Sequence, residues 1–374
     1  MHALWTFLVG WLTVHAVTPL LTLIHLDVLA GEPRQIAGAL LIALAQVLVI
    51  GGVLRPLESF APAEQWADRR TTRIDRTYTL LMLLGLNPLF AYLVLTPLAN
   101  AFSGATQAGG QATASGLAHW LPWFDLHPLA LFFVYYLIYD FAYYWMHRTQ
   151  HTMPWWWALH SMHHSQRQMS CWTNDRGSYV DGFLQSMVLA SVGLVIGVEP
   201  EQFALLMFIG ELAQNFSHAN IRFGFGRVLE KVFVDPRFHR LHHMRVDPER
   251  PRLHDCNYGQ VLSIWDVVFG TALHGESPRP TGVGDPMVDI DNERGLIAMQ
   301  WGAFRRFWGA LWTPAGWKPG DVAFDENYRP MPTAHTDLHR FERSPTAHAD
   351  AAAHARALDA ALPPTPVLDR VRSS

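Results

Sequence analysis

The segment that decides the fold is residues 128–151, PLALFFVYYLIYDFAYYWMHRTQH. Up to Met146 it is apolar apart from Asp140 and several tyrosines. As an α-helix at about 1.5 Å per residue it would be roughly 36 Å long, which exceeds the roughly 30 Å hydrocarbon core of a bilayer. His147 and His151 then lie just beyond the membrane boundary, on one helix face because they are four residues apart. The segment therefore predicts a membrane helix that ends in a histidine pair.

Other apolar runs extend this prediction to the whole chain. Three earlier runs, at residues 4–30, 36–54 and 78–102, are also long enough to cross a bilayer. A later pair, residues 183–198 and 202–216, is shorter and fits either a re-entrant hairpin or buried core helices. Only 16% of all residues are charged, against roughly 25% in an average soluble domain. We therefore expect an all-α integral membrane bundle of four or more transmembrane helices with a cytosolic helical cap that carries the histidines.

The distribution of arginine predicts the orientation. Residues 55–76, between the second and third runs, carry five arginines, whereas residues 103–127 carry neither arginine nor lysine. Positively charged loops stay on the cytoplasmic side of a membrane. We therefore expect residues 55–76 and the histidine clusters in the cytoplasm and residues 103–127 outside. The N-terminus lacks the basic start and the small-residue cleavage site of a signal peptide, so we expect its helix to be retained.

The chain contains 20 histidines against 28 lysines and arginines, and three dense clusters hold eight of them. One cluster has the pattern HxxxH and two have the pattern HxxHH, so each presents its imidazoles on one side of a helix. The eight residues are His147, His151, His160, His163, His164, His239, His242 and His243. Eight imidazoles exceed the three or four protein ligands of one zinc ion. They suit two metal ions with room for water or oxygen.

Three further residues are candidates because of their position. His218 ends the last apolar run, where the chain returns to the histidine-bearing side, and we expect a ninth metal ligand there rather than a polar interfacial anchor. Asp140 and Glu211 are acids inside apolar runs, and they precede His147 and His218 by seven residues on the same helix face. Acids at such depth are candidates for function, although a hydrogen bond between packed helices explains them equally well.

Characteristic segments surround the three clusters. They are YWMHR at 144–148, ALHSMHHS at 158–165, FHRLHH at 238–243, NYG at 257–259 and IWDVVFGT at 264–271. Over residues 129–271 the chain resembles the fatty acid hydroxylase and sterol desaturase superfamily. The resemblance implies a membrane non-haem diiron enzyme that uses O2 and two electrons to hydroxylate or desaturate an unactivated lipid C–H bond. It also implies that the eight clustered histidines bind iron, with His218 at the superfamily's intervening histidine.

Residues outside the clusters are expected to orient the imidazoles of such a site. Asp140 is one candidate, and Asn257 and Asp266, which follow the third cluster, are two more. Asn257 could instead form a turn, and Asp266 could instead cap a helix. Asp175 and Arg176 follow the second cluster at a place where members of the superfamily often carry polar residues.

The electrons require a separate donor. The sequence has no GxGxxG dinucleotide motif and no CxxCH haem motif, and its two cysteines cannot hold a four-cysteine iron–sulfur cluster. The resemblance implies two iron ions and O2 as co-substrate, and the missing motifs add an external reductant of the ferredoxin, cytochrome or pterin type. The expected partners are a lipid substrate and the bilayer. A net charge of −4 and a pI near 6.6 argue against a nucleic-acid partner.

Two other functions fit parts of the pattern. A metal transporter with a histidine-rich sensor would place several ionisable residues along one pore within the membrane, whereas the clusters here lie beyond helix ends. A membrane zinc hydrolase would need an open zinc site and a general base, and no HExxH motif occurs. Neither function explains the full set of motifs. On the resemblance we expect an oxygenase, with hydroxylation ahead of desaturation, in a bacterial inner membrane, and on the arginine distribution we expect its active site to face the cytoplasm.

The sequence divides into four regions. We expect a transmembrane region at 1–127, the catalytic domain at 128–275, a loop and a helix at 276–332, and a flexible tail at 333–374. Residues 295–312 mix apolar residues, arginines and three tryptophans, which fits either an interfacial amphipathic helix or an ordinary helix that caps the cytosolic part. Four tail histidines are expected to lie outside the metal site: His335, His339, His348 and His354.

Overall fold

The computed structural model describes residues 2–26, 33–66, 69–95, 97, 101, 117, 121–245, 256–276, 280–283, 288, 291–292, 295–312 and 336–338. Within these residues the chain is all-α except for one short antiparallel pair of strands, β1 (Glu64–Trp66) and β2 (Thr336–Leu338). The predicted fold class is therefore confirmed. Most of the expected outer loop, and all four tail histidines, lie outside the described residues.

The N-terminal part forms three long helical stretches. The first contains α1 (His2–Leu12), the π-helical turn η1 (Thr13–Val17) and α2 (Thr18–Leu23). The second contains α3 (Pro33–Val49), η2 (Ile50–Leu54) and α4 (Arg55–Phe60). The third contains α5 (Arg70–Leu81), η3 (Met82–Leu86), α6 (Asn87–Phe90) and η4 (Ala91–Leu95).

Prolines explain three of these π-helical turns. Pro19, Pro56 and Pro88 each follow a turn by two residues, so the residue four positions before each proline lies at the centre of the turn. In a regular α-helix the proline ring clashes with the carbonyl of that residue and cannot donate to it. A wider π-helical turn accommodates the ring. The long helices therefore continue past their prolines.

The remaining helices follow in the order of the chain. They are η5 (Pro122–Leu126), α9 (Pro128–Thr152), α10 (Pro154–His164), α11 (Tyr179–Ile196), α12 (Pro200–His218), α13 (Gly226–Leu229), α14 (Pro236–His242), α15 (Ile264–Phe269) and α17 (Leu296–Trp312).

Five helices among the described residues are long and apolar enough to cross a membrane. They are Ala3–Leu23, Pro33–Phe60, Arg70–Val94, Pro128–Thr152 and Tyr179–Ile196. The four long runs of the sequence supply four of these helices, and the first member of the shorter pair supplies the fifth. α12, which contains the second member, is not among them. The protein is therefore a membrane protein with a helical bundle.

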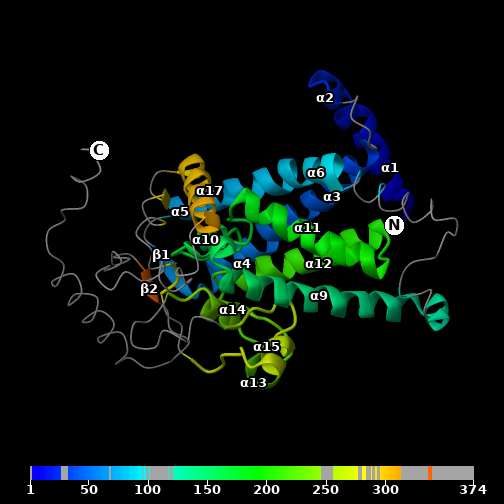
Figure 1. Ribbon diagram of the computed structural model, residues 1–374. Coiled ribbons are helices and arrows are strands. Elements are labelled where there is room, and N and C mark those ends of the chain that lie inside the picture. The colour runs from blue at the N-terminus through cyan, green and yellow to red at the C-terminus, as the bar shows by residue number, and fades with distance from the viewer. Residues whose placement is uncertain are drawn as a thin grey trace, which may run out of the picture.

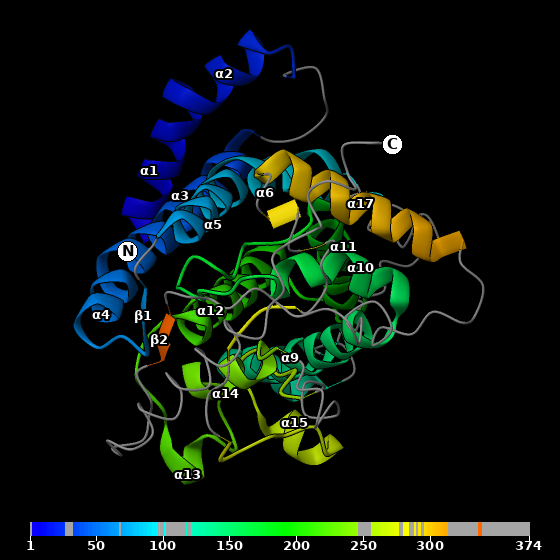
Figure 2. The same cartoon turned by 90° about the vertical axis from the view of Figure 1, so that its left-hand side faces the viewer.

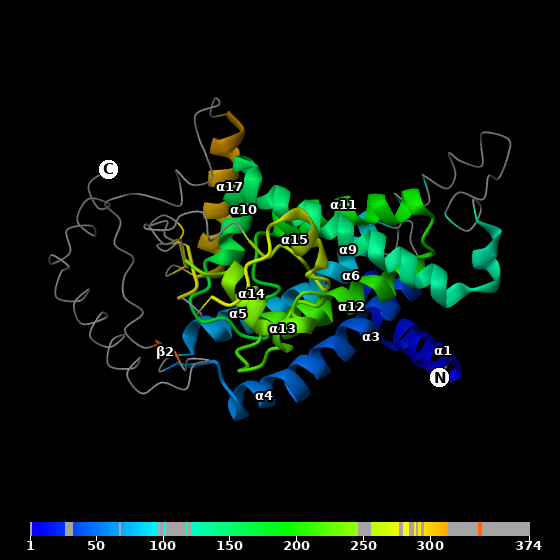
Figure 3. The same ribbon diagram turned by 90° about the horizontal axis from the view of Figure 1, so that it is seen from below.

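The bundle places the histidine-bearing helices at one end. α9 packs against α11 and α12, and α12 packs against α3 (Figure 1). The core between α9, α11 and α12 contains Tyr135, Tyr139, Leu189 and Leu206. Seen from below, α10, α14 and α17 lie at the opposite end of the bundle from α1 (Figure 3). At that end α10 packs against α9, and α14 packs against α12 (Figure 2).

Two local signals direct the clusters to this end. α9 stops at an extended residue, Met153, because the residue before a proline avoids the helical conformation. Pro154 then begins α10, where its fixed φ and missing N–H are favourable. α14 begins behind Asp235, whose carboxylate accepts a hydrogen bond of 2.8 Å from the backbone N–H of Phe238.

Candidate metal centre

Nine histidines meet where α9, α10, α12 and α14 converge. They are His147 and His151 from α9, His160, His163 and His164 from α10, His218 from α12, and His239, His242 and His243 from α14 and its C-cap. All nine are buried, and the most exposed of them, His163, retains only 8% of its accessible surface. The structure thus brings together every histidine that the sequence indicated as a ligand.

The nine imidazoles divide into two groups, within each of which the ligand atoms lie within 4.8 Å of one another. The five-histidine group is His147, His151, His160, His164 and His242, and the four-histidine group is His163, His218, His239 and His243. Each HxxHH triplet serves both groups. In α10, His160 and His164 belong to the five-histidine group and His163 belongs to the four-histidine group. In the α14 triplet, His242 belongs to the five-histidine group and His239 and His243 belong to the four-histidine group. The two groups are therefore interlocked.

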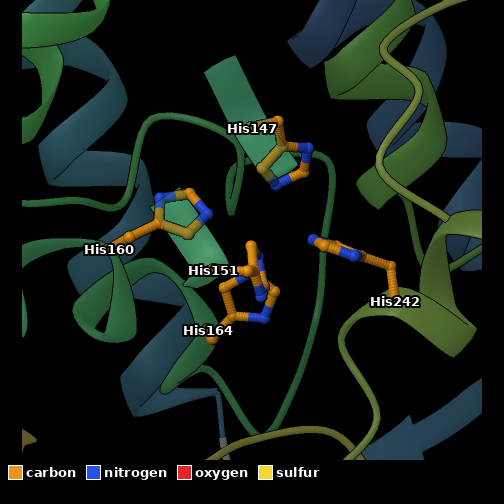
Figure 4. A group of neighbouring side chains, drawn as sticks. All are labelled: His147, His151, His160, His164 and His242. Carbon is orange, nitrogen blue, oxygen red and sulfur yellow. The ribbon is translucent and has the colours of Figure 1, made fainter. Parts of the chain in front are cut away.

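Figure 4 shows the rings of the five-histidine group facing one another, with His160 and His242 on opposite sides. Backbone carbonyls fix two of these rings. The Nδ1 of His147 lies 2.8 Å from the oxygen of Tyr258, and the Nδ1 of His242 lies 2.7 Å from the oxygen of Cys256. A carbonyl oxygen only accepts, so each Nδ1 carries the proton and donates it. The Nε2 atoms therefore present lone pairs to the centre of the group.

A carboxylate fixes a third ring. The Nδ1 of His160 lies 2.9 Å from Oδ2 of Asp181. The other carboxylate oxygen accepts hydrogen bonds of 2.8 Å from Gln150 Nε2 and from Trp156 Nε1. Such a carboxylate holds the imidazole in the tautomer and orientation that metal binding requires. The cluster patterns do not indicate Asp181, and its one signal in the sequence is an acid at the start of the apolar α11.

The four-histidine group is tighter. The Nε2 of His218 lies 3.1 Å from the Nε2 atoms of His163 and His243 and 3.0 Å from that of His239. The Nδ1 of His163 lies 2.9 Å from the carbonyl oxygen of Arg176, and the Nδ1 of His218 lies 2.7 Å from that of Gln214. Both Nδ1 atoms are donors by the same argument. Two Nε2 lone pairs therefore face each other at 3.1 Å.

This arrangement fits a bound cation. One N–H cannot satisfy three nitrogen neighbours at once. A metal ion about 2.1 Å from each nitrogen would hold neighbouring nitrogens roughly 3.0–3.4 Å apart at bond angles of about 90–110°. The buried Nε2 atoms of His147, His160 and His164 have no hydrogen-bond partner in the described part of the chain, and such groups are costly. One cation in each group would satisfy both sets of lone pairs.

Burial keeps the ligands neutral. It lowers the pKa of His163, His164, His239 and His243 well below the usual value, and the neighbouring histidines lower it further. At neutral pH these imidazoles are therefore uncharged. The neutral ring is the form that binds a metal ion.

Asp266 acts on His147 through the backbone. Its carboxylate accepts hydrogen bonds from the backbone N–H groups of Tyr258 (2.7 Å) and Gly259 (2.8 Å) and from the hydroxyl of Thr271 (2.7 Å). It thereby fixes the peptide whose carbonyl accepts from His147. Burial raises the pKa of Asp266 to about 6, against the effect of these hydrogen bonds, so the group is ionised at neutral pH.

The carboxylate of Asp140 is turned toward the segment before α15 rather than toward the histidines. It accepts from the backbone N–H groups of residues 261 and 262 at 3.1 and 3.3 Å and from the indole of Trp265 at 2.9 Å. These partners differ from the imidazoles that Asp140 was expected to orient. Any effect of Asp140 on His147 passes through the segment that also carries Tyr258.

Asn257 turns the chain and links two segments. Its φ of 59° lies in the left-handed region, which asparagine tolerates better than most residues. Its amide nitrogen donates to the carbonyl oxygens of Phe238 (2.8 Å) and Leu273 (3.2 Å), and its amide oxygen accepts from the N–H of Leu273 (2.7 Å). Because Phe238 precedes His239, Asn257 positions α14 and not an imidazole directly.

Buried polar groups position the loop after α10. Arg176, whose carbonyl accepts from His163, pairs with Asp75 on α5 at 2.7 Å. Glu211 accepts a hydrogen bond of 2.7 Å from Asn174. Burial, and then the charge of Glu211, raise the pKa of Asp175 to about 8. Glu211 thus links α12 to this loop.

Comparison with known proteins shows what the region around this site is similar to. Residues 132–271 match the family model described as fatty acid hydroxylase. The chain is 29% identical over 190 residues to the alkylglycerol monooxygenase of Danio rerio. The aligned part is 48% of this chain and 41% of that protein. It is 28% identical over 240 residues to the ornithine lipid hydroxylase OlsE of Rhizobium tropici. This aligned part is 62% of this chain and 67% of that protein.

The human alkylglycerol monooxygenase is 29% identical over 177 residues, which cover 47% of this chain and 37% of that protein. The chain thus covers about two fifths of the length of these monooxygenases. No solved structure matches significantly. All nine clustered histidines, and Asp140, Asn257 and Asp266, lie inside the matched region, and the resemblance seen in the motifs is confirmed. Both histidine groups therefore lie within residues 132–271, the region that matches the fatty acid hydroxylase family model.

Proposed function

We propose that each histidine group binds one iron ion and that the protein is an oxygenase that hydroxylates a C–H bond of a membrane lipid. The observation that supports this most strongly is the division of nine buried imidazoles into interlocked groups of five and four. Ferrous iron accepts imidazole ligands, and iron can activate O2, which redox-inert zinc cannot. When bound, the iron pair would supply the oxygen chemistry, which is the hard step of the reaction.

The chain's own residues prepare the site for these ions. Asp181 and the carbonyls of Tyr258, Cys256, Arg176 and Gln214 place a proton on Nδ1 of their histidines and so leave Nε2 free to bind. Burial of all nine rings excludes bulk water, which protects reactive species from side reactions.

A lipid is the proposed substrate. The relatives are named for alkylglycerol and for ornithine lipid, and their names describe a monooxygenase and a hydroxylase. α9 is one of the five candidate spans and carries His147 and His151 at its end. A lipid chain in the bilayer would therefore lie beside the helix that leads to the site. We favour hydroxylation over desaturation because both names describe the insertion of oxygen.

We further propose that the site faces the cytoplasm of a bacterial inner membrane and receives electrons from a ferredoxin, cytochrome or pterin. The arginine-rich start of α5 lies at the same end of the bundle as α10 and α14 (Figure 1), and arginine-rich ends of membrane helices stay in the cytoplasm. Cys171 and Cys256 are both buried. Two cysteines are too few for a four-cysteine cluster, so the donor is a separate molecule.

Comparative lipid analysis tests this function. A deletion strain should lack an oxidised lipid that returns with the wild-type gene. It should not return with His163→Ala or with His242→Ala, which remove one ligand from each group. His127→Ala is the matched control, since this exposed ring stacks on Trp123 and lies outside both groups, and it should restore the lipid. An unchanged lipid profile in the deletion strain, together with altered metal uptake, would support a transporter instead.

A further inference from the structure

α17 (Leu296–Trp312) carries a surface that the oxygenase function does not use. One side of the helix packs on the protein through Met299 and Ala303, which join Tyr78 of α5 and Met162 of α10 in one buried cluster. Gln300 on the same side donates to the carbonyl oxygen of Gly177 at 2.7 Å. This side is an ordinary helix-packing face.

A second side is apolar and exposed. Ile297, Trp301, Phe304 and Trp308 follow one another at spacings of four, three and four residues, so they form one stripe along the helix. Ile297 is 82% exposed, Trp301 60% and Trp308 53%. A continuous stripe of large apolar side chains on the surface marks an interaction site.

The third side is polar. It contains Arg305, which is exposed, and Arg306, which pairs with Asp291 at 2.6 Å. Gly309 also lies there, and a Cβ at Gly309 would meet nothing within 4 Å. The helix therefore has a packed side, an apolar outer side and a polar side.

The direction of α17 explains the three sides. It runs across the direction of α9 in two views (Figures 1 and 3). α9 and the stretch that begins with α3 are candidate membrane spans. A helix that crosses the direction of the spans at the end where α9 would leave the membrane has the direction expected of a helix on the membrane surface. Tryptophan and arginine are the residues favoured at that level.

We propose that the exposed stripe of α17 is embedded in the surface of the lipid bilayer, on the side of the membrane where the histidine groups lie. The stripe contacts the level of an anionic bilayer at which the headgroups meet the acyl chains. This inference does not depend on the metal or on the reaction. It combines the two alternatives that the sequence leaves open, because α17 caps α10 with one side and binds lipid with another.

Positive charge beside α17 fits anionic headgroups. A groove of about 560 Å³ on α5 is lined by Arg70, Arg73, Ile74 and Thr77. Ile74 packs against the cluster that contains Met299 of α17, so the groove lies next to the first half of that helix. Basic residues near a membrane surface are attracted to anionic lipids over about a Debye length.

Site-directed spin labelling of the full-length protein in phosphatidylcholine–phosphatidylglycerol vesicles tests the proposal. Single cysteines are introduced as Phe304→Cys and Trp308→Cys on the stripe and as Gly309→Cys on the polar side. Collision of each label with O2, which concentrates in lipid, is compared with collision with a water-soluble nickel complex. Cys171 and Cys256 are buried, and the unsubstituted protein reports any background labelling.

We expect O2 to dominate at residues 304 and 308 and the nickel complex to dominate at 309. Ile297→Cys replaces either stripe variant if that variant does not insert. Equal nickel access at 304, 308 and 309 would overturn the proposal, because the stripe would then face water. Exclusion of both reagents at 304 and 308, with dipolar broadening between labels, would also overturn it and would indicate a second copy of the chain. Iron content and lipid oxidation do not enter this measurement, so it fails or succeeds independently of the proposed function.

Discussion

Replacement of Asp181 by asparagine should weaken metal binding at the five-histidine group alone. Asp181 accepts three hydrogen bonds of 2.8–2.9 Å, from Gln150, Trp156 and His160. Asparagine keeps one oxygen for the first two donors but turns an N–H donor toward the Nδ1–H of His160. Two donors cannot pair, so His160 loses this bond or moves its proton to Nε2, where the lone pair is needed.

The expected loss is large enough to measure. Removing a group that orients a metal-binding histidine typically lowers metal affinity about 10- to 100-fold, which is about 1.4–2.8 kcal/mol. The four-histidine group should keep its affinity, because other partners orient it, namely the carbonyls of Arg176 and Gln214.

Transfer of iron to a chelator from detergent-purified protein separates the two sites. Wild-type protein should release iron in two phases of similar amplitude. In Asp181→Asn one phase should become about 10- to 100-fold faster while the other is unchanged. His160→Ala is the matched control, since it removes the ligand itself and should abolish the same phase. Equal acceleration of both phases, or of neither, would refute the role assigned to Asp181.

Three further predictions test other parts of the structure. Asp140→Asn should lower iron retention less than Asp181→Asn does, because Asp140 binds the segment at 261–265 and not a histidine; full iron and full turnover would remove Asp140 from the functional site. The metal-free protein should lose stability as the pH falls below about 6.5, because the buried histidines have lowered pKa values in the folded state and take up protons when unfolded. The free energy of unfolding should fall by at most about 1.4 kcal/mol per pH unit for each such histidine. A melting temperature that stays constant from pH 7.5 to 5.5 would contradict this prediction. His335→Ala and His348→Ala should leave lipid hydroxylation unchanged, and a loss of product at normal expression would place the tail in the site.

The membrane helices and the histidine set could be predicted from the sequence because both depend on local periodicity. Apolar runs of sufficient length gave the helices, and spacings of three and four gave the shared helix faces. The division into two groups could not be predicted in this way. His163 and His242 each belong to a different group from the other histidines of their own helix, and this depends on how the tertiary fold places α10 and α14.

The residues that orient the ligands were harder to identify for another reason. Several ring partners are backbone carbonyls, such as those of Tyr258 and Arg176, and a carbonyl leaves no side-chain signal in the sequence. Asp266 and Asn257 lie close to the predicted place but act on the backbone. Asp140 shares a helix with His147, yet its carboxylate faces residues 261–265 because their N–H groups need an acceptor.

Metal content per chain tests the central claim most directly. Protein purified without oxygen in a mild detergent should contain two irons per chain, one for each histidine group. The variants His160→Ala and His218→Ala should each lower this value toward one, since each removes a ligand from a different group. A single tightly held zinc with no iron, and activity restored by zinc alone, would contradict the two-iron site.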